Sequence, residues 1–532
     1  MKSDENQDVD LSRLQSSTEK SYDTYPYESH PFPLTHPEHL SVLAKLFGMS
    51  PASPQKCRVL ELGCAAGGNL IPMAVQLPKS QFFGVDLSGM QIKQGQERIK
   101  ALKLKNIKIE HKDILDVGGR IRKFDYIICH GVYSWVPDDV RKKILAICRD
   151  YLNDNGVAYI SYNTYPGWHM RESIRNMMQF HVAQFSTMQE KVDQSRALLN
   201  FLVESVETEG NPYGEYLAKE LASLSGARDT YIAHEHLEGQ NEAVYFHQFA
   251  QHASEYELQY LSDADFSSML ATNFPAKVAQ TLQRVGRNLV QMEQYMDFLR
   301  NRMFRASLLC EKDIELKRAI DPGVITDLHI ASPIKPDKGD VDLTSSIPQE
   351  FVTPKGIRIG AGNAVTKAAF KILGDLWPSS IPFNDLLDRA VKLTGAKGKT
   401  LQEGLAADLL KAYTANGIEL HSSKQPFVIK VSDKPMTTAL VRNQIESGLV
   451  VTNQRHESVT LTEPLRQLLK LLDGKHTQKQ LLEKLTALIL DNVLVIQEEG
   501  KPIRDEARLQ AFVPEFLKQM LSELAKRALL IG

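Results

Sequence analysis

The segment 58–69 has the residue types and spacing of a loop that holds a nucleotide-type cofactor. An apolar run ends at Glu61 and is followed by a turn of small residues, Gly63, Cys64, Ala65, Ala66, Gly67 and Gly68. Only residues with little or no side chain let the backbone turn sharply out of a parallel strand and approach a ligand closely. The next apolar run ends in Asp86, 23 positions after Gly63, where a carboxylate can accept both hydroxyls of an adenosine ribose. The pattern predicts a site for a dinucleotide or for S-adenosylmethionine.

Two acids and the loose turn favour S-adenosylmethionine. A dinucleotide site needs G-x-G-x-x-G, so that a pyrophosphate can lie on a helix N-terminus, and the segment 63–68 fits that pattern only loosely. Glu61 stands two residues before the turn, where a carboxylate repels phosphate and suits a sulfonium and an ammonium group. Asp113 follows the next apolar run and provides an acceptor where an adenine amino group would lie. We therefore expect S-adenosylmethionine as the cofactor.

Polar and aromatic residues follow the two later strands of the pattern. They are His130, Tyr133 and Trp135 after one strand, and Asn163 and Tyr165 after the other. Because ligands bind outside the carboxyl ends of the strands in doubly wound folds, we expect these side chains where the methyl group faces its acceptor. For any single aromatic residue, packing between domains is an equal alternative. An aromatic channel lowers the pKa of an amine and attracts its ammonium form, so it suits lysine. His130 could take the proton, or hydrogen-bond the cofactor or Tyr133.

The elements that must position these residues alternate between strand and helix. Apolar strands are expected at 57–62, 81–85, 106–110, 124–129 and 157–162. This alternation predicts an α/β, Rossmann-like, mainly parallel sheet with helices on both faces. From 170 to 325 the apolar spacing is helical, and two later segments each have the strand and helix order of a winged helix. We expect a tail at 1–20, a cofactor domain at 21–190, a helical domain at 191–330, and winged-helix-like modules at 331–432 and 433–532.

Composition limits the partners. The formal charge of −2 over 532 residues argues against a general nucleic-acid or membrane-surface binder. The five cysteines lack C-x-x-C spacing and are expected to be core thiols. No metal site is expected, because the histidines at 234, 236, 247 and 252 do not have a ligand spacing such as H-E-x-x-H. With no signal peptide and no apolar run near ~18 residues, we expect a cytoplasmic protein that does not insert into membranes.

The motifs together resemble a known family. Four motifs carry the resemblance: a proline- and aromatic-rich segment at 25–37, His-Gly-Val-Tyr-Ser-Trp-Val-Pro from residue 130, Tyr-Asn-Thr-Tyr-Pro-Gly-Trp from 162 and His-Glu-His-Leu-Glu from 234. With them the chain resembles bacterial class I methyltransferases that have a methyltransferase regulatory domain, in particular the rickettsial-type protein lysine methyltransferases. The resemblance implies a protein substrate and middle helices that can mediate a homodimer. By motif position it implies that Glu61, Gly63, Asp86, Leu87, Asp113, Ile114 and His130 contact the cofactor, and that Tyr133, Trp135, Asn163 and Tyr165 face the acceptor.

The expected activity is methyl transfer to lysine side chains of a protein. The alternatives are a small-molecule methyltransferase, and a regulatory protein that binds S-adenosylmethionine and uses its winged helices for binding. The roughly 350 residues beyond a single catalytic domain of ~100–200 residues favour a macromolecular substrate. The expected helices at 383–394 and 478–488 carry mixed charge, whereas a DNA-reading helix is basic.

Overall fold

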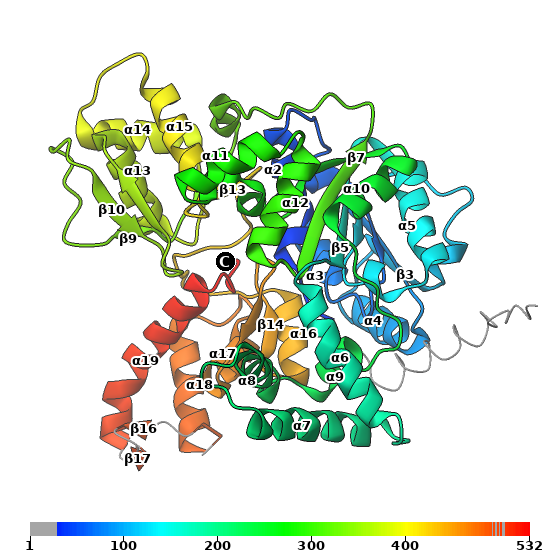
Figure 1. Ribbon diagram of the computed structural model, residues 1–532. Helices are drawn as coiled ribbons and strands as arrows, with labels where there is room; N and C mark the ends of the chain where they lie inside the picture. Colours follow the sequence, from blue (N-terminus) through cyan, green and yellow to red (C-terminus); the bar gives the residue numbers. More distant parts are fainter. Residues whose placement is uncertain (1–28, 492, 495–496, 499–500, 503–505) are drawn as a thin grey trace, which may run out of the picture.

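The computed structural model describes residues 29–532 except 492, 495–496, 499–500 and 503–505. The expected tail at 1–20 lies outside the described residues. A seven-stranded sheet forms the centre of the first part of the chain (Figure 1). Its strands are β1 Arg58–Leu62, β2 Gln81–Asp86, β3 Ile107–His111, β4 Phe124–Cys129, β5 Leu152–Asn163, β6 Leu258–Asp263 and β7 Phe304–Glu311. The first five strands confirm the expected ones.

The strand order is β3-β2-β1-β4-β5-β7-β6; β1 to β5 are parallel, and β7 is antiparallel to both of its neighbours, β5 and β6. The order reverses between β1 and β4, which are neighbours, and this is where doubly wound sheets bind ligands. Helices join and cover the strands; they are α2 Pro37–Leu46, α3 Leu70–Gln76, α4 Gly89–Ala101 and α5 Asp138–Tyr151. The Rossmann-like fold class is confirmed.

The middle of the chain differs from the expectation of helices alone between 170 and 325. The helices are α6 Trp168–Val182, α7 Met188–Ser205, α8 Pro212–Ser225, α9 Asp229–His236, α10 Phe246–Glu255, α11 Ala276–Val285 and α12 Leu289–Arg300. The apolar side chains of α6 to α9 form a core of their own. Strands β6 and β7, however, extend the catalytic sheet, and the expected boundary at 190/191 falls inside α7. The expectation of helices alone was wrong. Strand β7 contains buried polar residues that hydrogen-bond to neighbouring elements, so its sequence does not show the apolar pattern of a buried strand.

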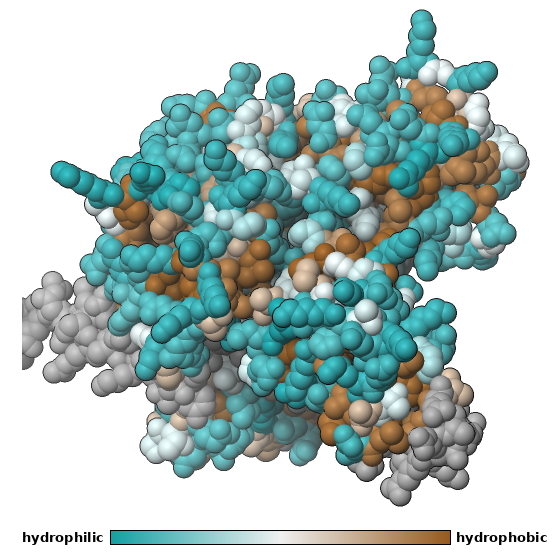
Figure 2. Space-filling model, turned by 180° about the vertical axis from the view of Figure 1, so that it is seen from behind, coloured by the Kyte–Doolittle hydropathy of each residue, from teal (hydrophilic) through white to brown (hydrophobic). Residues whose placement is uncertain are grey.

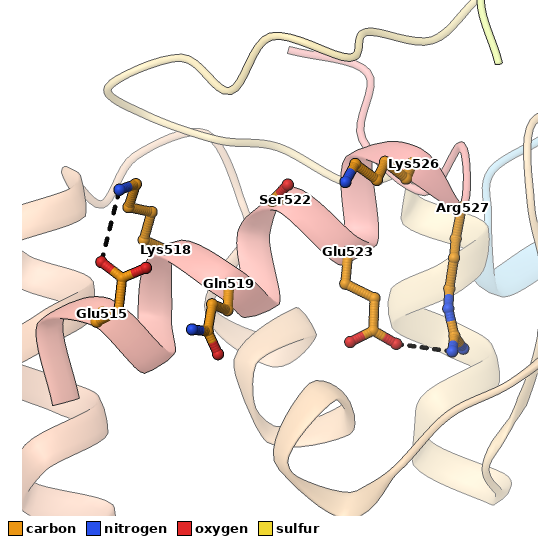
Figure 3. Close-up of a pocket in the computed structure, with 7 residues that line it drawn as sticks. All are labelled: Glu515, Lys518, Gln519, Ser522, Glu523, Lys526 and Arg527. Atoms are coloured by element: carbon orange, nitrogen blue, oxygen red, sulfur yellow. Dashed lines mark hydrogen bonds and ion pairs between the residues drawn. The ribbon is translucent and has the colours of Figure 1, made fainter. Parts of the chain in front are cut away.

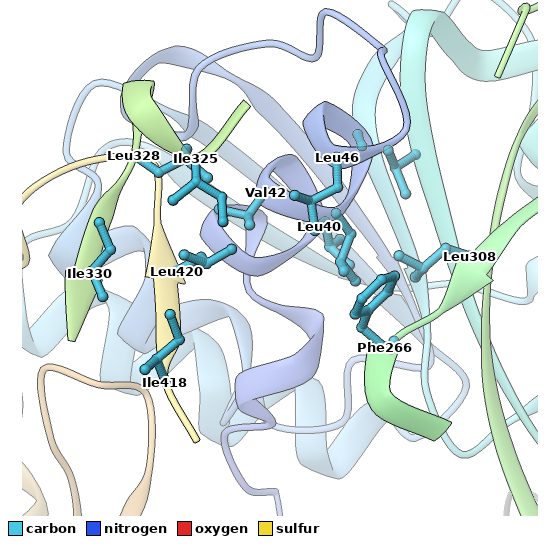
Figure 4. Packing of buried hydrophobic residues seen from close by; sticks show 14 of the residues in the cluster. Leu40, Val42, Leu46, Phe266, Leu308, Ile325, Leu328, Ile330, Ile418 and Leu420 are labelled. Carbon is cyan, nitrogen blue, oxygen red and sulfur yellow. The ribbon is translucent and has the colours of Figure 1, made fainter. Parts of the chain in front are cut away.

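Two smaller modules follow. The first contains β8 His329–Ala331, β9 Lys335–Pro336, β10 Gln349–Val352, β11 Arg358–Ala361, α13 Ala364–Leu376, β12 Ile381–Pro382, α14 Phe383–Thr394, α15 Leu401–Thr414 and β13 Glu419–His421. The second contains α16 Ala439–Ser447, β14 Val450–Thr452, β15 Ser458–Thr460, α17 Glu463–Leu471, α18 Gln478–Leu490, β16 Gln497–Glu498, β17 Lys501–Pro502 and α19 Glu506–Lys526. The first module shares a hydrophobic core with the catalytic sheet through α2 (Figure 4), whereas the second has a separate core.

The surface and the thiols add two observations. On the face seen in Figure 2, hydrophobic patches lie among hydrophilic side chains. Large exposed apolar residues include Phe180 and Phe201 on α6 and α7. All five cysteines are free and buried, as expected for core thiols. No helix within the described ranges is long and apolar enough to cross a membrane.

Candidate active site

The small-residue turn after β1 lies against the loop after β4, at the point where the strand order reverses. The backbone N–H groups of Gly63 and Cys64 both donate to the carbonyl of Val85, at 2.9 and 3.0 Å. Gly63 has φ +77°, and a Cβ there would overlap the side chain of Val132. Ala65 accepts φ +47° although it is not glycine, and Gly67 has φ +73°. The turn therefore presents backbone to the crevice with little side-chain bulk.

Glu61 is a buried carboxyl group with one of its two oxygens in a hydrogen bond. Its Oε1 accepts a hydrogen bond from Asn69 Nδ2 at 2.7 Å. Its Oε2 is buried and has no hydrogen-bond partner among the described residues. Burial raises the pKa of Glu61 to about 8; the Asn69 hydrogen bond lowers it and nearby Asp86 raises it further. A buried acceptor without a partner is costly, so this oxygen fits a cationic ligand group such as an ammonium.

The acids after β2 and β3 lie on neighbouring loops. Asp86 accepts hydrogen bonds from Ala65 N, at 2.7 Å, and Ser88 N, at 2.9 Å, so its carboxylate also fixes the β1 turn. Asp113 begins a short 3₁₀ turn and accepts from Leu115 N at 2.8 Å. Leu87 is half-buried and Ile114 is buried. The structure thus brings the predicted ribose and adenine acceptors to the same edge of the sheet as Glu61.

An N-terminal strap, defined here as residues 29–36, covers the turn. The start of the proline- and aromatic-rich segment at 25–37, before residue 29, lies outside the described part of the chain. Ser29 Oγ accepts from Gly68 N at 2.6 Å, and a Cβ on Gly68 would overlap the Ser29 carbonyl. Phe32 N donates to Asn69 Oδ1 at 3.0 Å. The strap therefore restricts access to the turn from one side.

His130 sits at the end of β4 in contact with three rings. The Phe32 ring lies on it at 3.8 Å between centroids, with Tyr159 at 5.8 Å and Phe304 at 6.2 Å. His130 Nδ1 lies 2.9 Å from Tyr159 Oη and 3.3 Å from Ser161 Oγ. Burial lowers the pKa of His130 to about 4, so the imidazole is neutral near pH 7. A base with so low a pKa accepts a proton poorly from an ammonium group.

Tyr133 does not join His130. It is buried in the core, where it packs on Phe249 and Tyr162, and its hydroxyl lies 2.6 Å from His252 Nδ1. The hydrogen bond from His130 to Tyr133 that the sequence left open is therefore absent, and the expectation that Tyr133 lines the acceptor pocket is corrected. The short 3₁₀ turn at Tyr133–Trp135 directs its ring into the core instead of the crevice.

Trp135, Asn163 and Tyr165 belong to a second group beside the β5 end. The Trp135 ring meets Trp168 edge-on at 6.4 Å and lies under the Arg175 guanidinium at 5.3 Å. Tyr165 stacks on His169 at 3.8 Å and approaches Tyr245 at 5.3 Å. Asn163 is buried, and its Nδ2 has no partner within the described part of the chain. Asn163 is in register with Phe304, which joins this group to the His130 group.

Sequence reasoning missed several residues of the site. Asn69 contacts Glu61, the strap and His456 of the second C-terminal module. Tyr159 and Phe304 contact His130 from β5 and β7. Asn69 could have been found, because it directly follows the glycine turn. No local signal identifies His456, whose role depends on packing between distant segments.

Another hollow of the surface does not resemble a site. It runs along α19 and is lined by that helix and the residue that follows it: Glu515, Lys518, Gln519, Ser522, Glu523, Lys526 and Arg527 (Figure 3). Its ion pairs join neighbours on the same helix, Lys518 with Glu515 and Arg527 with Glu523. Among the residues that the structure describes, no group of three or more His, Cys, Asp and Glu side chains could hold a metal ion.

Comparisons with known proteins agree with this geometry. Three family models match the chain: a methyltransferase domain over residues 60–158, a predicted methyltransferase regulatory domain over 228–311, and the PKMT C-terminal winged helix domain over 433–529. The uncharacterized protein RP789 of Rickettsia prowazekii (strain Madrid E) is 37% identical over 523 residues, which are 96% of this chain and 93% of that protein.

Solved structures are similar over nearly the whole chain. The structure of PKMT2 from Rickettsia typhi in complex with AdoHcy is 32% identical and has a TM-score of 0.86, covering 95% of this chain and 100% of that one. A second structure of PKMT2 from Rickettsia typhi has 31% identity, a TM-score of 0.87 and the same coverage.

Proposed function

This chain belongs to the bacterial class I S-adenosylmethionine-dependent methyltransferases that carry a regulatory domain and a PKMT-type winged helix domain, and we propose that it methylates lysine side chains of a protein substrate. The observation that carries the proposal is the aromatic wall around the neutral His130 at the reversal point of the sheet. Such a wall suits an uncharged amine at the end of a long side chain that reaches into the crevice.

The cofactor residues form the first part of the proposal. S-Adenosylmethionine, when bound, supplies an electrophilic methyl group on a positively charged sulfur. The free Oε2 of Glu61 would accept from its ammonium group, and Asp86 would accept from the ribose hydroxyls. The remaining contacts would come from the β1 turn, from the two loops beside it and from the end of β4: Gly63, Cys64, Ala65, Leu87, Asp113, Ile114 and His130. Among all the proposed cofactor contacts, only Glu61, Asp86 and Asp113 have carboxyl side chains.

The acceptor side depends on desolvation more than on a general base. A lysine ammonium has an unperturbed pKa of ~10.4, and an apolar, aromatic surrounding lowers it. His130, with a pKa of about 4, is poorly suited to remove that proton, so we assign the proton to bulk water before the amine is enclosed. Phe32, Phe304 and Tyr165 would then exclude water and align the amine.

The modules beyond the catalytic sheet support a protein substrate. This chain matches PKMT2 of Rickettsia typhi over 95% of its length, and its residues 433–529 match the PKMT winged helix model. A small-molecule acceptor could bind within the crevice alone, whereas a protein substrate needs additional surface on the enzyme to bind to. The homodimer expected from the middle helices stays a prediction; Phe180 and Phe201, exposed on α6 and α7, are apolar surface that it could bury.

Transfer of labelled methyl groups into a protein extract tests the reaction. The purified chain, labelled S-adenosylmethionine and a bacterial extract should give label in protein, and mass mapping should place it on lysine. The matched control is Asp86→Asn, which removes the charge of the proposed ribose acceptor and should abolish labelling. Label confined to the low-mass fraction would identify a small-molecule methyltransferase. Binding of the cofactor without any transfer would support the regulatory alternative.

A further inference from the structure

The turn between β14 and β15 of the second C-terminal module reaches the catalytic domain. We call residues 450–460 the wing. Its turn residues Asn453, Gln454 and His456 are buried, although a hairpin turn is usually exposed. Gln76 at the end of α3 donates through Nε2 to the Asn453 carbonyl at 3.1 Å. The wing is therefore fixed beside the helix that begins at the cofactor turn (Figure 1).

His456 makes a specific contact there. Its Nε2 lies 2.7 Å from Asn69 Oδ1, which also accepts from Phe32 N at 3.0 Å. A backbone N–H can only donate, so the atom that faces both groups is the amide oxygen and not the amide nitrogen. His456 must therefore donate from Nε2. Its Nδ1 is buried with no partner among the described residues, which agrees with a neutral ring.

The other end of the Asn69 amide contacts Glu61. Asn69 Nδ2 donates to Glu61 Oε1 at 2.7 Å and to Thr35 Oγ1 at 2.9 Å. If the amide were reversed, its oxygen would face the Glu61 carboxylate and its NH₂ group would face two donors. His456 and Phe32 thus set the orientation in which Asn69 holds Glu61, and leave Oε2 of Glu61 for a ligand.

We propose that His456 is a positioning residue of the cofactor site, by which the wing orients Asn69 and, through it, the Glu61 carboxylate. The inference rests on the proposed contact of Glu61 with the ammonium group of the cofactor. It implies that the segment matched by the methyltransferase model, residues 60–158, does not contain the whole cofactor site. A displacement of the second module would release Asn69 and weaken the hold on the methyl donor.

Two variants that differ by one methylene test this. The amide NH₂ of His456→Gln can occupy the place of Nε2, whereas that of His456→Asn falls short. With full-length protein, calorimetry should show S-adenosylhomocysteine binding about 5- to 10-fold weaker in His456→Asn, the effect of one lost hydrogen bond, and close to wild type in His456→Gln. His476→Asn is the control, because His476 pairs with Asp473 inside the second module.

A double-mutant cycle separates positioning from general loss of structure. In the Asn69→Ala background, His456→Asn should change the affinity less than twofold, because the residue it acts on is absent. Wild-type affinity of His456→Asn, equal weakening by Gln and Asn, or additive effects of the two substitutions would each overturn the inference. Glu61→Gln separates the inference from the proposed function on which it rests. If Glu61→Gln binds S-adenosylhomocysteine as tightly as wild type, the proposed ammonium contact is contradicted. If Glu61→Gln binds more weakly and His456→Asn binds like wild type, only the role of His456 is contradicted.

Discussion

At the scale of single residues, the pKa of Glu61 bears on its proposed contact with the ammonium group of the cofactor. In the ligand-free protein, burial raises the pKa of this carboxyl to about 8, so it is mostly protonated at pH 7. A positively charged ligand group stabilises the carboxylate and lowers that pKa. Binding should therefore release a proton, and the affinity should depend on pH.

The first prediction is that the affinity for S-adenosylmethionine rises with pH between about 6 and 8 and levels off above, with a limiting slope of about tenfold per pH unit. The sign follows because the carboxylate form, present above its pKa, is the form that binds the cation. Calorimetry in buffers of different ionisation enthalpy measures the released proton. Glu61→Gln should bind more weakly and lose this part of the pH dependence. If Glu61→Gln retains the wild-type profile, another group accounts for it.

The second prediction concerns Tyr165 and Trp135. Substitution of either by Ala should leave the affinity for S-adenosylmethionine within a few-fold and lower kcat/KM for the acceptor by about 10- to 100-fold, because positioning is lost. Tyr165→Phe keeps the stack on His169 and loses only the long hydrogen bond to Glu172, at 3.3 Å, so it should stay near wild type. Steady-state kinetics with the identified protein substrate provide the measurement. A fall in cofactor affinity as large as that of Asp86→Asn would assign these residues to the cofactor side.

At the scale of elements, strand β7 carries a buried charge network. Arg305 is fully buried and donates to Asp297 at 2.7 and 2.9 Å and to Glu293 at 3.0 Å, with Asp263 at 3.4 Å. These acids lie on α12 and β6, so the network links α12, β6 and β7 next to Phe304. Phe304, whose ring meets that of His130, directly precedes Arg305 on β7.

The third prediction is that Arg305→Met destabilises the protein by about 3–5 kcal/mol, since buried Glu293 loses its cation and buried Asp297 keeps only the 3.8 Å contact with Arg302. Urea unfolding followed by circular dichroism measures the free energy of unfolding. Arg284→Met on α11 is the control, because Arg284 is exposed, and it should change stability by less than about 0.5 kcal/mol. A loss below about 1 kcal/mol in Arg305→Met would mean that the acids are satisfied by protonation or water.

The same network explains what the sequence could not predict. Apolar runs predicted β1 to β5, and the residues at their ends predicted the small-residue turn and the acids that the structure brings to one edge of the sheet. Strand β7 has Arg305 and Ser307 at inward positions, and both look like surface residues until Asp297 and Tyr162 are seen to satisfy them. Tyr133 follows β4 in sequence, but the local turn, not the strand end, sets its direction.

At the scale of the whole molecule, the catalytic sheet and the first C-terminal module are not independent. Helix α2 packs between β7, through Leu308, and the β8–β13 pair, through Ile330 and Leu420, in one hydrophobic cluster (Figure 4). Glu38 of α2 also accepts hydrogen bonds from Ser422 and Ser423, which follow β13. The second module has its own core, although Leu440 of α16 belongs to the shared cluster, and its wing meets the catalytic domain through polar contacts.

The last prediction follows from this difference between the two modules. Ile330→Ala and Leu485→Ala each remove a fully buried aliphatic side chain, at a cost of about 2–5 kcal/mol. Scanning calorimetry should show that Ile330→Ala lowers the midpoint of the transition that S-adenosylhomocysteine raises, because Ile330 belongs to the cluster under the cofactor-binding sheet. Leu485→Ala should mainly lower a separate transition, that of the core formed by α16 to α19. If the two variants lower the same single transition equally, the polar contacts of the wing couple the modules as strongly as a shared core does.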